Sequence, residues 1–267
     1  MRWPPLVVSH LSTPRYTNLL AWVMLLVGMG CARGNPPLVV VGQVAPTPEC
    51  ILDPAGNLFV FEHVLDLDLA TRDQIVPPSR AAYFTPLLVL NHMVNRFGFA
   101  MRYPPMADSN GLTIVGAEVE ILDAQGRRLP RGLYRAQASG FVPSALEDQP
   151  GRGIAAVDLI PRSYVPILVE WFTDRSNSEG LLTVQVSVIG VSQGGVEVKS
   201  APFVLPIRLC YGCLFVEGVL EEGERQACFP GQDQVAKVGG YSPPQPCTSS
   251  EECPSGRCLL GRCAAAE

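Results

Sequence analysis

The sequence predicts an all-β protein: a β-sandwich of about eight strands over residues 50–209, followed by a small, irregular, disulfide-rich module over residues 210–267. Apolar and polar residues alternate with a period of two through the first region, as they do in strands that bury one face. After residue 209, Gly, Pro and polar residues replace this alternation, and seven of the nine cysteines follow. A segment with so few apolar residues needs disulfides to hold it together.

Alternation is clearest in residues 64–70 (VLDLDLA), 117–122 (AEVEIL) and 181–190 (LLTVQVSVIG). Further apolar or alternating runs are 83–91 (YFTPLLVLN), 133–139 (LYRAQAS), 153–160 (GIAAVDLI), 166–172 (PILVEWF) and 203–209 (FVLPIRL). Turn sequences such as DPAGN, DSNG and SQGG separate these runs. Short strands at this spacing are typical of a β-sandwich, Ig-like in the broad sense.

Prolines set limits on these strands. Pro86, Pro166 and Pro206 lie inside or beside the apolar runs. Because proline has no N–H to donate in a central strand, we expect them at strand starts, edges or bulges. Helical periodicity is weak after residue 30, so we expect short strands and turns there and no long helix.

The first 30 residues have the composition of a secretory signal. They contain Arg2 and Arg15 and no acidic residue, and residues 19–30 (LLAWVMLLVGMG) are uncharged, apolar and end in small residues. A basic lead, an apolar run and a small-residue exit predict a signal peptide. The run is shorter than the roughly 20 residues that a membrane-spanning helix needs.

The residue after this run is Cys31, and LLVGMGC resembles the lipobox of bacterial lipoproteins. The resemblance covers the first 31 residues and implies cleavage before Cys31 and a lipid on its sulfur. Several acyl chains would anchor the chain firmly. Gly28 stands where the family usually carries Leu, and soluble secretion is the alternative. Ala32, in place of the Asp that retains many such proteins at the inner membrane, implies the outer membrane of a Gram-negative bacterium.

Residues 31–49 predict a Pro-rich tether between this anchor and the sandwich. They carry four prolines, and Pro-rich linkers are extended, at about 3.1 Å per residue. The run LVVV at residues 38–41 has an alternative interpretation as an edge strand.

With Cys31 assigned to lipid, eight cysteines remain: Cys50, Cys210, Cys213, Cys228, Cys247, Cys253, Cys258 and Cys263. An even number in an exported chain predicts a disulfide framework. Eight cysteines allow 105 pairings, so the count alone does not say which residues pair.

The last four cysteines lie in CTSSEECPSGRCLLGRC, which resembles small cysteine-rich modules of the Dickkopf or colipase kind. The resemblance covers seventeen residues and implies the pairs Cys247–Cys258 and Cys253–Cys263. Cys50 would then pair with one of Cys210, Cys213 and Cys228.

Two short motifs invite a chemical interpretation. Residues 190–194 (GVSQG) match the G-x-S-x-G nucleophile elbow around Ser192, but another strand pattern follows and no histidine comes later in the chain. We therefore expect a β-hairpin turn. Residues 210–213 (CYGC) form a C-x-x-C motif that follows a strand, where a redox motif sits at a helix N-terminus. We expect structural disulfides here, in preference to a redox pair or a zinc site.

The remaining candidates have simpler interpretations. His63 and His92 are the only histidines after residue 30, and each lies in a strand pattern, so we expect them to be structural or exposed. Asp66 and Asp68 belong to the polar face of one expected strand, and a calcium site would need more oxygen ligands on one loop. The sequence predicts no catalytic residue, no cofactor and no metal ligand.

Charge and architecture together suggest a function. Removal of residues 1–30 leaves 18 basic and 25 acidic side chains, a net charge of −7, which disfavours nucleic-acid binding. We expect an envelope lipoprotein without catalytic activity and with a structural, adhesive or ligand-binding role. Its partners would be the membrane, through the lipid, and another envelope protein or a polysaccharide. The alternatives are a periplasm-facing accessory subunit of a secretion or assembly complex and, third, an envelope hydrolase or thiol redox protein.

Overall fold

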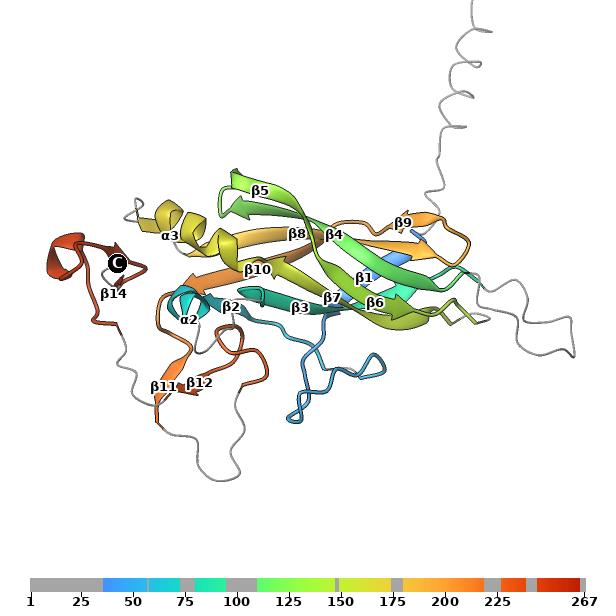
Figure 1. Ribbon diagram of the computed structural model, residues 1–267, viewed down its shortest axis with the longest axis horizontal. Helices are drawn as coiled ribbons and strands as arrows, with labels where there is room; N and C mark the ends of the chain where they lie inside the picture. The colour runs from blue at the N-terminus through green and yellow to red at the C-terminus, as the bar shows by residue number, and fades with distance from the viewer. Residues whose placement is uncertain are drawn as a thin grey trace, which may run out of the picture. The chain divides into compact units, whose positions relative to one another are not determined.

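One curled sheet of ten strands makes up most of the protein (Figure 1). The computed structural model describes residues 36–56, 58–72, 80–94, 110–146, 149–173, 180–218, 227–238 and 244–264. The predicted all-β class is confirmed, since strands far outnumber the few short helices of this part of the chain. The expected signal peptide, Cys31 and the start of the tether lie outside the described residues.

The strands of the large sheet run in the order β1-β3-β7-β6-β4-β8-β10-β2, with β5 beside β4 and β9 beside β8. Their bounds are β1 Leu38–Gln43, β2 His63–Asp66, β3 Tyr83–Asn91, β4 Leu112–Asp123, β5 Arg128–Ala136, β6 Ala138–Val142, β7 Gly151–Ile160, β8 Leu181–Ser192, β9 Glu197–Lys199 and β10 Phe203–Cys210. All neighbours are antiparallel except β10 and β2, which are parallel.

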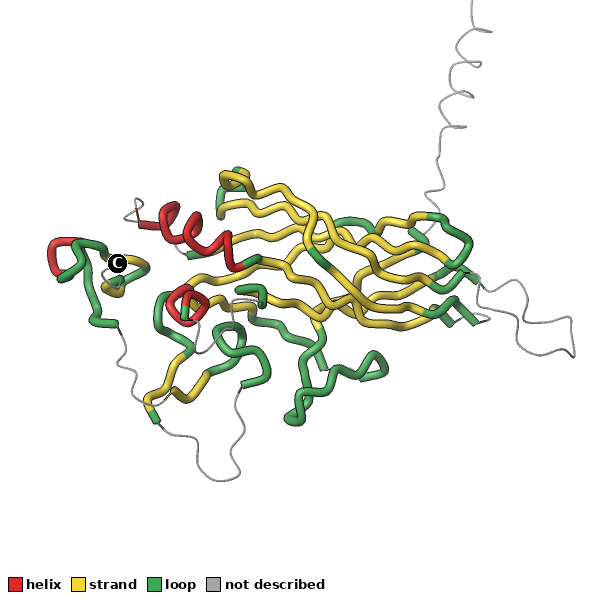
Figure 2. Tube along the Cα trace, viewed as in Figure 1, coloured by secondary structure: helices red, strands yellow, loops and turns green. Residues whose placement is uncertain are grey.

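The sheet curls because β4 changes partner along its length. Its first residues, 112–114, pair with β6, whereas residues 117–122 pair with β5. Strand β6 also pairs with β7, so hydrogen bonds continue through β6 from one half of the sheet to the other. The strand trace in Figure 2 follows this path.

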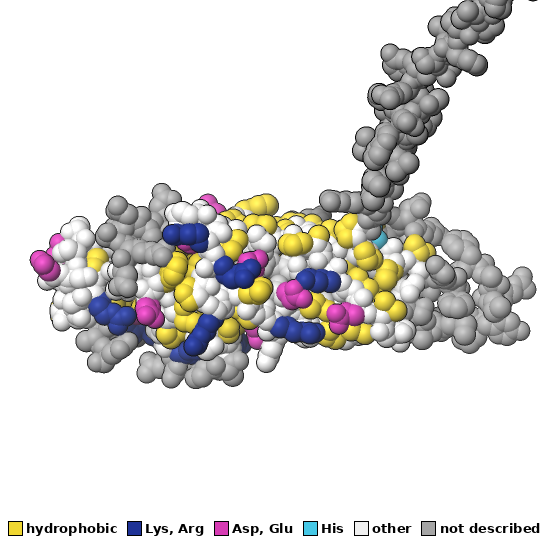
Figure 3. All heavy atoms as spheres, turned by 90° about the horizontal axis from the view of Figure 1, so that it is seen from above, with side chains coloured by type: hydrophobic (Ala, Val, Ile, Leu, Met, Phe, Trp, Pro, Cys, Tyr) yellow, Lys and Arg dark blue, Asp and Glu magenta, His cyan; other side chains and the backbone are white. Residues whose placement is uncertain are grey.

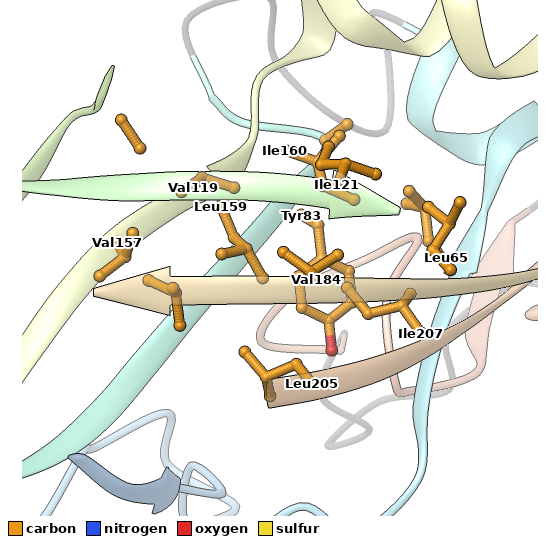
Figure 4. Close-up of a cluster of buried hydrophobic side chains, with 14 of the residues drawn as sticks. Leu65, Tyr83, Val119, Ile121, Val157, Leu159, Ile160, Val184, Leu205 and Ile207 are labelled. Carbon is orange, nitrogen blue, oxygen red and sulfur yellow. The ribbon is translucent and has the colours of Figure 1, made fainter. Parts of the chain in front are cut away.

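The core lies between the two halves of the sheet. Figure 4 shows side chains from β3 and β7 packed with side chains from β4, β8 and β10, among them Tyr83, Val157, Leu159, Val119, Ile121, Val184, Leu205 and Ile207. The alternation in β4 and β8 places every second side chain in this core, as the sequence predicts. Burial of these apolar side chains supplies most of the driving force for folding.

The run VLDLDLA is a strand only up to Asp66, so the prediction of one strand over residues 64–70 is wrong. Strand β2 ends there, and helix α2 covers Leu67–Thr71. The Asp66 carboxylate accepts hydrogen bonds from the N–H groups of Asp68 and Leu69 and caps the helix. The Asp66 cap therefore stabilises a helix here, although the period-two pattern predicts a strand.

The run PILVEWF is a helix, and its prediction as a strand is also wrong. Helix α3 covers Val165–Thr173, after a 3-10 turn at Arg162–Tyr164. Pro166 lies in its first turn, where its missing N–H has no cost. Val165, Leu168 and Phe172 form its buried face. None of the helices in the described residues is long and apolar enough to cross a membrane.

The predicted tether is wrong for residues 38–43, which form β1 at one edge of the sheet, the alternative interpretation of residues 38–41. The expectation for the prolines is met only in part, because Pro86 and Pro206 lie inside β3 and β10. Pro206 pairs with Thr183 of β8 and directly precedes the residues of β10 that pair with β2. Its missing N–H therefore removes no hydrogen bond between β10 and β2.

The C-terminal residues pack against the sheet. We expected a boundary after residue 209, but Pro36–Glu267 form one compact unit. Small strand pairs lie in this region: β11 Phe215–Glu217 with β12 Ala236–Val238, and β13 Cys258–Leu259 with β14 Arg262–Cys263.

Four disulfides join the eight cysteines of the described residues: Cys50–Cys228, Cys210–Cys213, Cys247–Cys258 and Cys253–Cys263. The last two are the pairs that the resemblance to cysteine-rich modules implies. Cys50 pairs with Cys228, across 178 residues of sequence, and so links the segment before β2 to the region after β11.

The close approach of β6 and β7 generates a stability prediction. A Cβ at Gly153 would lie 2.3 Å from the carbonyl oxygen of Phe141, which is backbone and has no room to move. We expect Gly153→Ala to destabilise the protein by about 1–3 kcal/mol, the usual cost of overpacking. Urea unfolding measures the change.

Gly194→Ala is the matched control, because its nearest neighbour would be the Ser192 Oγ at 3.7 Å. We expect this variant to unfold at the urea concentration of the wild type. Equal stability of the two variants would contradict the tight β6–β7 contact.

Candidate functional site

Ser192 lies in a hairpin. It is the last residue of β8, and its N–H donates to Val196 across a turn that leads into β9. The N–H of Val196 in turn donates to the Ser192 Oγ, at 3.1 Å. The predicted β-hairpin turn is confirmed, and the strand that follows gives Ser192 the context of a turn residue.

His63 belongs to a buried polar network that sequence reasoning missed. The Tyr83 hydroxyl donates to both carboxylate oxygens of Asp233, at 2.7 and 2.9 Å, and lies 3.3 Å from His63 Nδ1. Gln43 donates from Nε2 to Asp233 at 2.8 Å. Its Oε1 accepts from the Thr85 hydroxyl at 2.8 Å. These side chains come from three strands and one loop, so no local pattern could have revealed them.

The network holds the loop around residue 233 on the sheet. Asp233 also accepts the Val64 N–H, and its own N–H donates to the Val64 carbonyl. Next to it, the Gln232 side chain pairs with both backbone groups of Phe84, at 2.6 Å each. Asp233 has a φ of 54°, in the left-handed region that aspartate tolerates. The contacts of this loop compensate for that conformation.

Burial sets the protonation of this network. It lowers the pKa of His63, against the opposing charge of Asp233, so His63 is neutral at pH 7. Burial raises the pKa of Asp233, although its hydrogen bonds and His63 oppose the rise. Burial also raises the pKa of Tyr83 far above its usual range, so the hydroxyl stays protonated and donates. Tyr83 is fully buried, which makes this network a structural feature and not an open site.

Asp66 organises a second buried cluster, around the C-x-x-C motif. We expected this side chain on the polar face of a strand, but it is fully buried. Besides capping α2, its carboxylate accepts the N–H groups of Gly212 at 2.8 Å and Leu214 at 2.9 Å. Burial raises the pKa of Asp66, and these hydrogen bonds oppose the rise. The carboxylate thus fixes the backbone of the loop that contains Cys210 and Cys213.

A pocket of about 550 Å³ opens beside this loop. It is lined by Gly180, Leu181, Arg208, Leu209, Cys210, Tyr211, Cys213, Leu260 and Arg262. Its walls therefore combine a disulfide, two arginines and apolar side chains from segments far apart in the sequence. Arg262 donates to the Pro244 carbonyl at 3.1 Å, whereas Arg208 is an exposed residue of β10.

Within the described ranges, two groups of side chains lie close enough together to hold a metal ion: Cys247, Cys253 and Cys258, and Asp66, Cys210 and Cys213. Zinc binds cysteine as the thiolate. The cysteines of both groups are joined in disulfides, so in this state they provide no thiolate ligands.

A second pocket, of about 420 Å³, lies where β5 and β7 end near the 3-10 turn. Its lining includes Arg80, Arg135, Arg162, Gln137 and Asp158. Three guanidinium groups against one carboxylate make it locally basic, although the whole chain has a net charge of −5. Burial raises the pKa of Asp158. Arg162 also donates to the Thr71 carbonyl.

The two histidines and Asp68 are thus accounted for. His92 is exposed at the end of β3, and its N–H donates to the Pro37 carbonyl at 2.8 Å. Asp68 is buried in α2 and forms an ion pair with Arg72, at 3.1 Å. Neither His92 nor Asp68 lines the two pockets described above.

The His63 environment predicts a pH dependence. In the folded protein its pKa lies below the value of about 6.5 found in unfolded chains. The unfolded chain therefore binds the proton more tightly, and the contribution of neutral His63 to stability is lost as the pH falls below about 6.5. We expect the stability advantage of the wild type over His63→Gln to shrink as the pH falls through this window.

Urea unfolding of both proteins at a series of pH values measures the advantage. Asp233 is retained in both, so the comparison reports on His63 together with its charge interaction with Asp233. A stability difference that stays constant from neutral to acidic pH would contradict the burial of a neutral imidazole.

Known proteins offer no template for this arrangement. No protein-family model, curated protein or solved structure matches the chain. What the molecule does is therefore inferred from its own residues and geometry.

Proposed function

We propose that the protein is a lipid-anchored lipoprotein of the Gram-negative outer membrane, cleaved before Cys31, that acts by binding and not by catalysis. Its body would be an Ig-like sandwich in the broad sense. The shared core between the two halves of the curled sheet supports that description. The partners would be the membrane and an envelope component outside the chain.

The pairing of the cysteines carries this proposal. The sequence has nine cysteines, and the eight in the described residues pair with one another. No partner among them is left for Cys31, which is the residue that the lipobox resemblance assigns to lipid. A complete set of disulfides also fits an oxidising, extracytoplasmic location.

The basic pocket formed by Arg80, Arg135 and Arg162 supports a binding role. Guanidinium groups form charge-assisted, bidentate hydrogen bonds with carboxylates and sulfates. On the face shown in Figure 3, basic and acidic side chains are interspersed. Ion pairs on the sheet illustrate this, such as Arg128 with Glu120 and Lys199 with Glu118. The ligand that this pocket favours is an acidic polysaccharide.

The main alternative is a periplasm-facing accessory subunit of an envelope complex. The two locations differ in exposure to the outside of the cell. Protease added to intact cells removes a surface-exposed protein and spares a periplasmic one, and lysed cells show that the protease cleaves the protein when it has access.

Lipidation generates the first prediction here. We expect Cys31→Ser to abolish acylation and to move the protein from the membrane fraction to the soluble fraction, because no other part of the proposal anchors it. Intact mass measurement and membrane fractionation test this. Ala32→Ser, one residue further on, should keep the acyl chains and the membrane fraction, with a mass that differs from the wild type only by the substitution. A membrane-bound Cys31→Ser protein whose mass also differs from the wild type only by the substitution would refute the lipid anchor.

The basic pocket generates a second prediction, about ligand binding. We expect Arg135→Gln to weaken binding to polygalacturonate, an acidic polysaccharide, by about tenfold, since a hydrogen bond to a charged group contributes about 1.5–3 kcal/mol. Neutral dextran should not bind. Calorimetry measures both affinities.

Arg128→Gln is the matched control on the same strand, where it removes only a surface ion pair of small energetic value. If the wild-type protein does not bind polygalacturonate but binds polyglutamate, the partner is an acidic protein and not a polysaccharide. Equal losses in the two arginine variants would contradict a site in this pocket.

A further inference from the structure

The Cys210–Cys213 disulfide differs from the other three in the loop that it closes. Its cysteines are three residues apart, against 10, 11 and 178 for the others. A disulfide stabilises a fold mainly by restricting the unfolded chain, and a short loop restricts it least. Opening this bridge therefore costs the fold less than opening Cys50–Cys228.

The loop also keeps its conformation by other means. Asp66 holds the N–H groups of Gly212 and Leu214, and Tyr211 packs in the main core. These contacts do not involve either sulfur. With the bridge open, the backbone should keep the two cysteines side by side, ready to pair again.

Access to the bridge is one-sided. Cys213 is exposed, whereas Cys210 lies deeper at the end of β10. Both line the 550 Å³ pocket, together with Arg208 and Arg262, and among the described residues of that lining none is acidic. Arginine is always charged at physiological pH, so the two arginines attract a small molecule that carries carboxylates into the pocket, against the opposing Asp66 carboxylate within 4.8 Å of both sulfurs.

We propose that Cys210–Cys213 is a redox-active disulfide that captures small anionic thiols in the pocket beside it. The thiolate attacks Cys213 Sγ, the bond between the two cysteine sulfurs breaks, and Cys210 leaves as a thiolate that takes a proton from water. The product is a mixed disulfide on Cys213 and a thiol on Cys210. The exchange itself needs no other oxidant or reductant.

Asp66 prolongs the captured state. Its carboxylate lies within 4.8 Å of both sulfurs, and a neighbouring negative charge disfavours the Cys210 thiolate. Because the thiolate is the attacking species, Cys210 releases the bound thiol slowly. The site thus differs from a C-x-x-C at a helix N-terminus, where the first turn stabilises the thiolate. The same charge on Asp66 makes Cys210 a poorer leaving group, so capture is also slow and the site does not suit rapid turnover.

The test uses the full mature chain with reduced glutathione, which carries two carboxylates, and with cysteamine, which carries an amine. Rates are compared per thiolate by intact mass and peptide mapping. We expect a glutathione adduct on Cys213 before any other cysteine reacts, formed several-fold faster than the cysteamine adduct. Added salt should remove the preference, because screening weakens the attraction.

Arg208→Gln should lower the glutathione rate several-fold and leave the cysteamine rate unchanged or higher. Arg128→Gln, which is not part of the pocket lining, should alter neither. Adducts that form on Cys50 or Cys228 as fast as on Cys213, or equal rates for the two thiols, would overturn the proposal. Because the readout is a covalent adduct on Cys213, it is independent of lipid on Cys31 and of polysaccharide binding.

Discussion

The carboxylate of Asp66 is the contact on which one end of the protein depends. It accepts four backbone N–H groups, two from the start of α2 and two from the loop after β10. A buried charge is costly unless it is fully hydrogen-bonded, and here each donor is itself a buried group that needs an acceptor. One side chain therefore ends β2, begins α2 and fixes the turn that carries the C-x-x-C disulfide.

Asp233 does the same for the next segment of the chain. It joins Tyr83, Gln43 and the backbone of Val64, which lie 150 to 190 residues away in sequence. Asp66 is the last residue of β2 in its parallel pair with β10, and Asp233 contacts the same strand at Val64. Polar contacts, together with the Cys50–Cys228 bridge, thus attach a C-terminal region that has few apolar residues of its own.

Alternation in the sequence predicts the strands that have one buried face, and β3, β4, β7, β8 and β10 form where it appears. It fails at α2 because Leu67, Asp68, Leu69 and Ala70 are all buried, so the sequence of this helix shows no helical period. It fails at α3 because a short apolar run fits a strand or a helix equally well. Pro166, at the first turn of α3, was a usable signal. The cysteine framework and the C-x-x-C motif were visible in the sequence. The pocket beside them was not, because Arg208 and Arg262 meet there only after the chain folds.

The parallel pairing of β2 with β10 has a consequence for the order of folding. Residues 63–66 find their hydrogen-bonding partners at residues 207–210, so β2 has no neighbour on that side until most of the chain exists. Contacts between such distant segments are slow to form, because a long loop must close first. A ribosome delivers the N-terminal strands first. The β2–β10 pair therefore forms late in folding. The segment after β10 packs last, onto a sheet that has already formed.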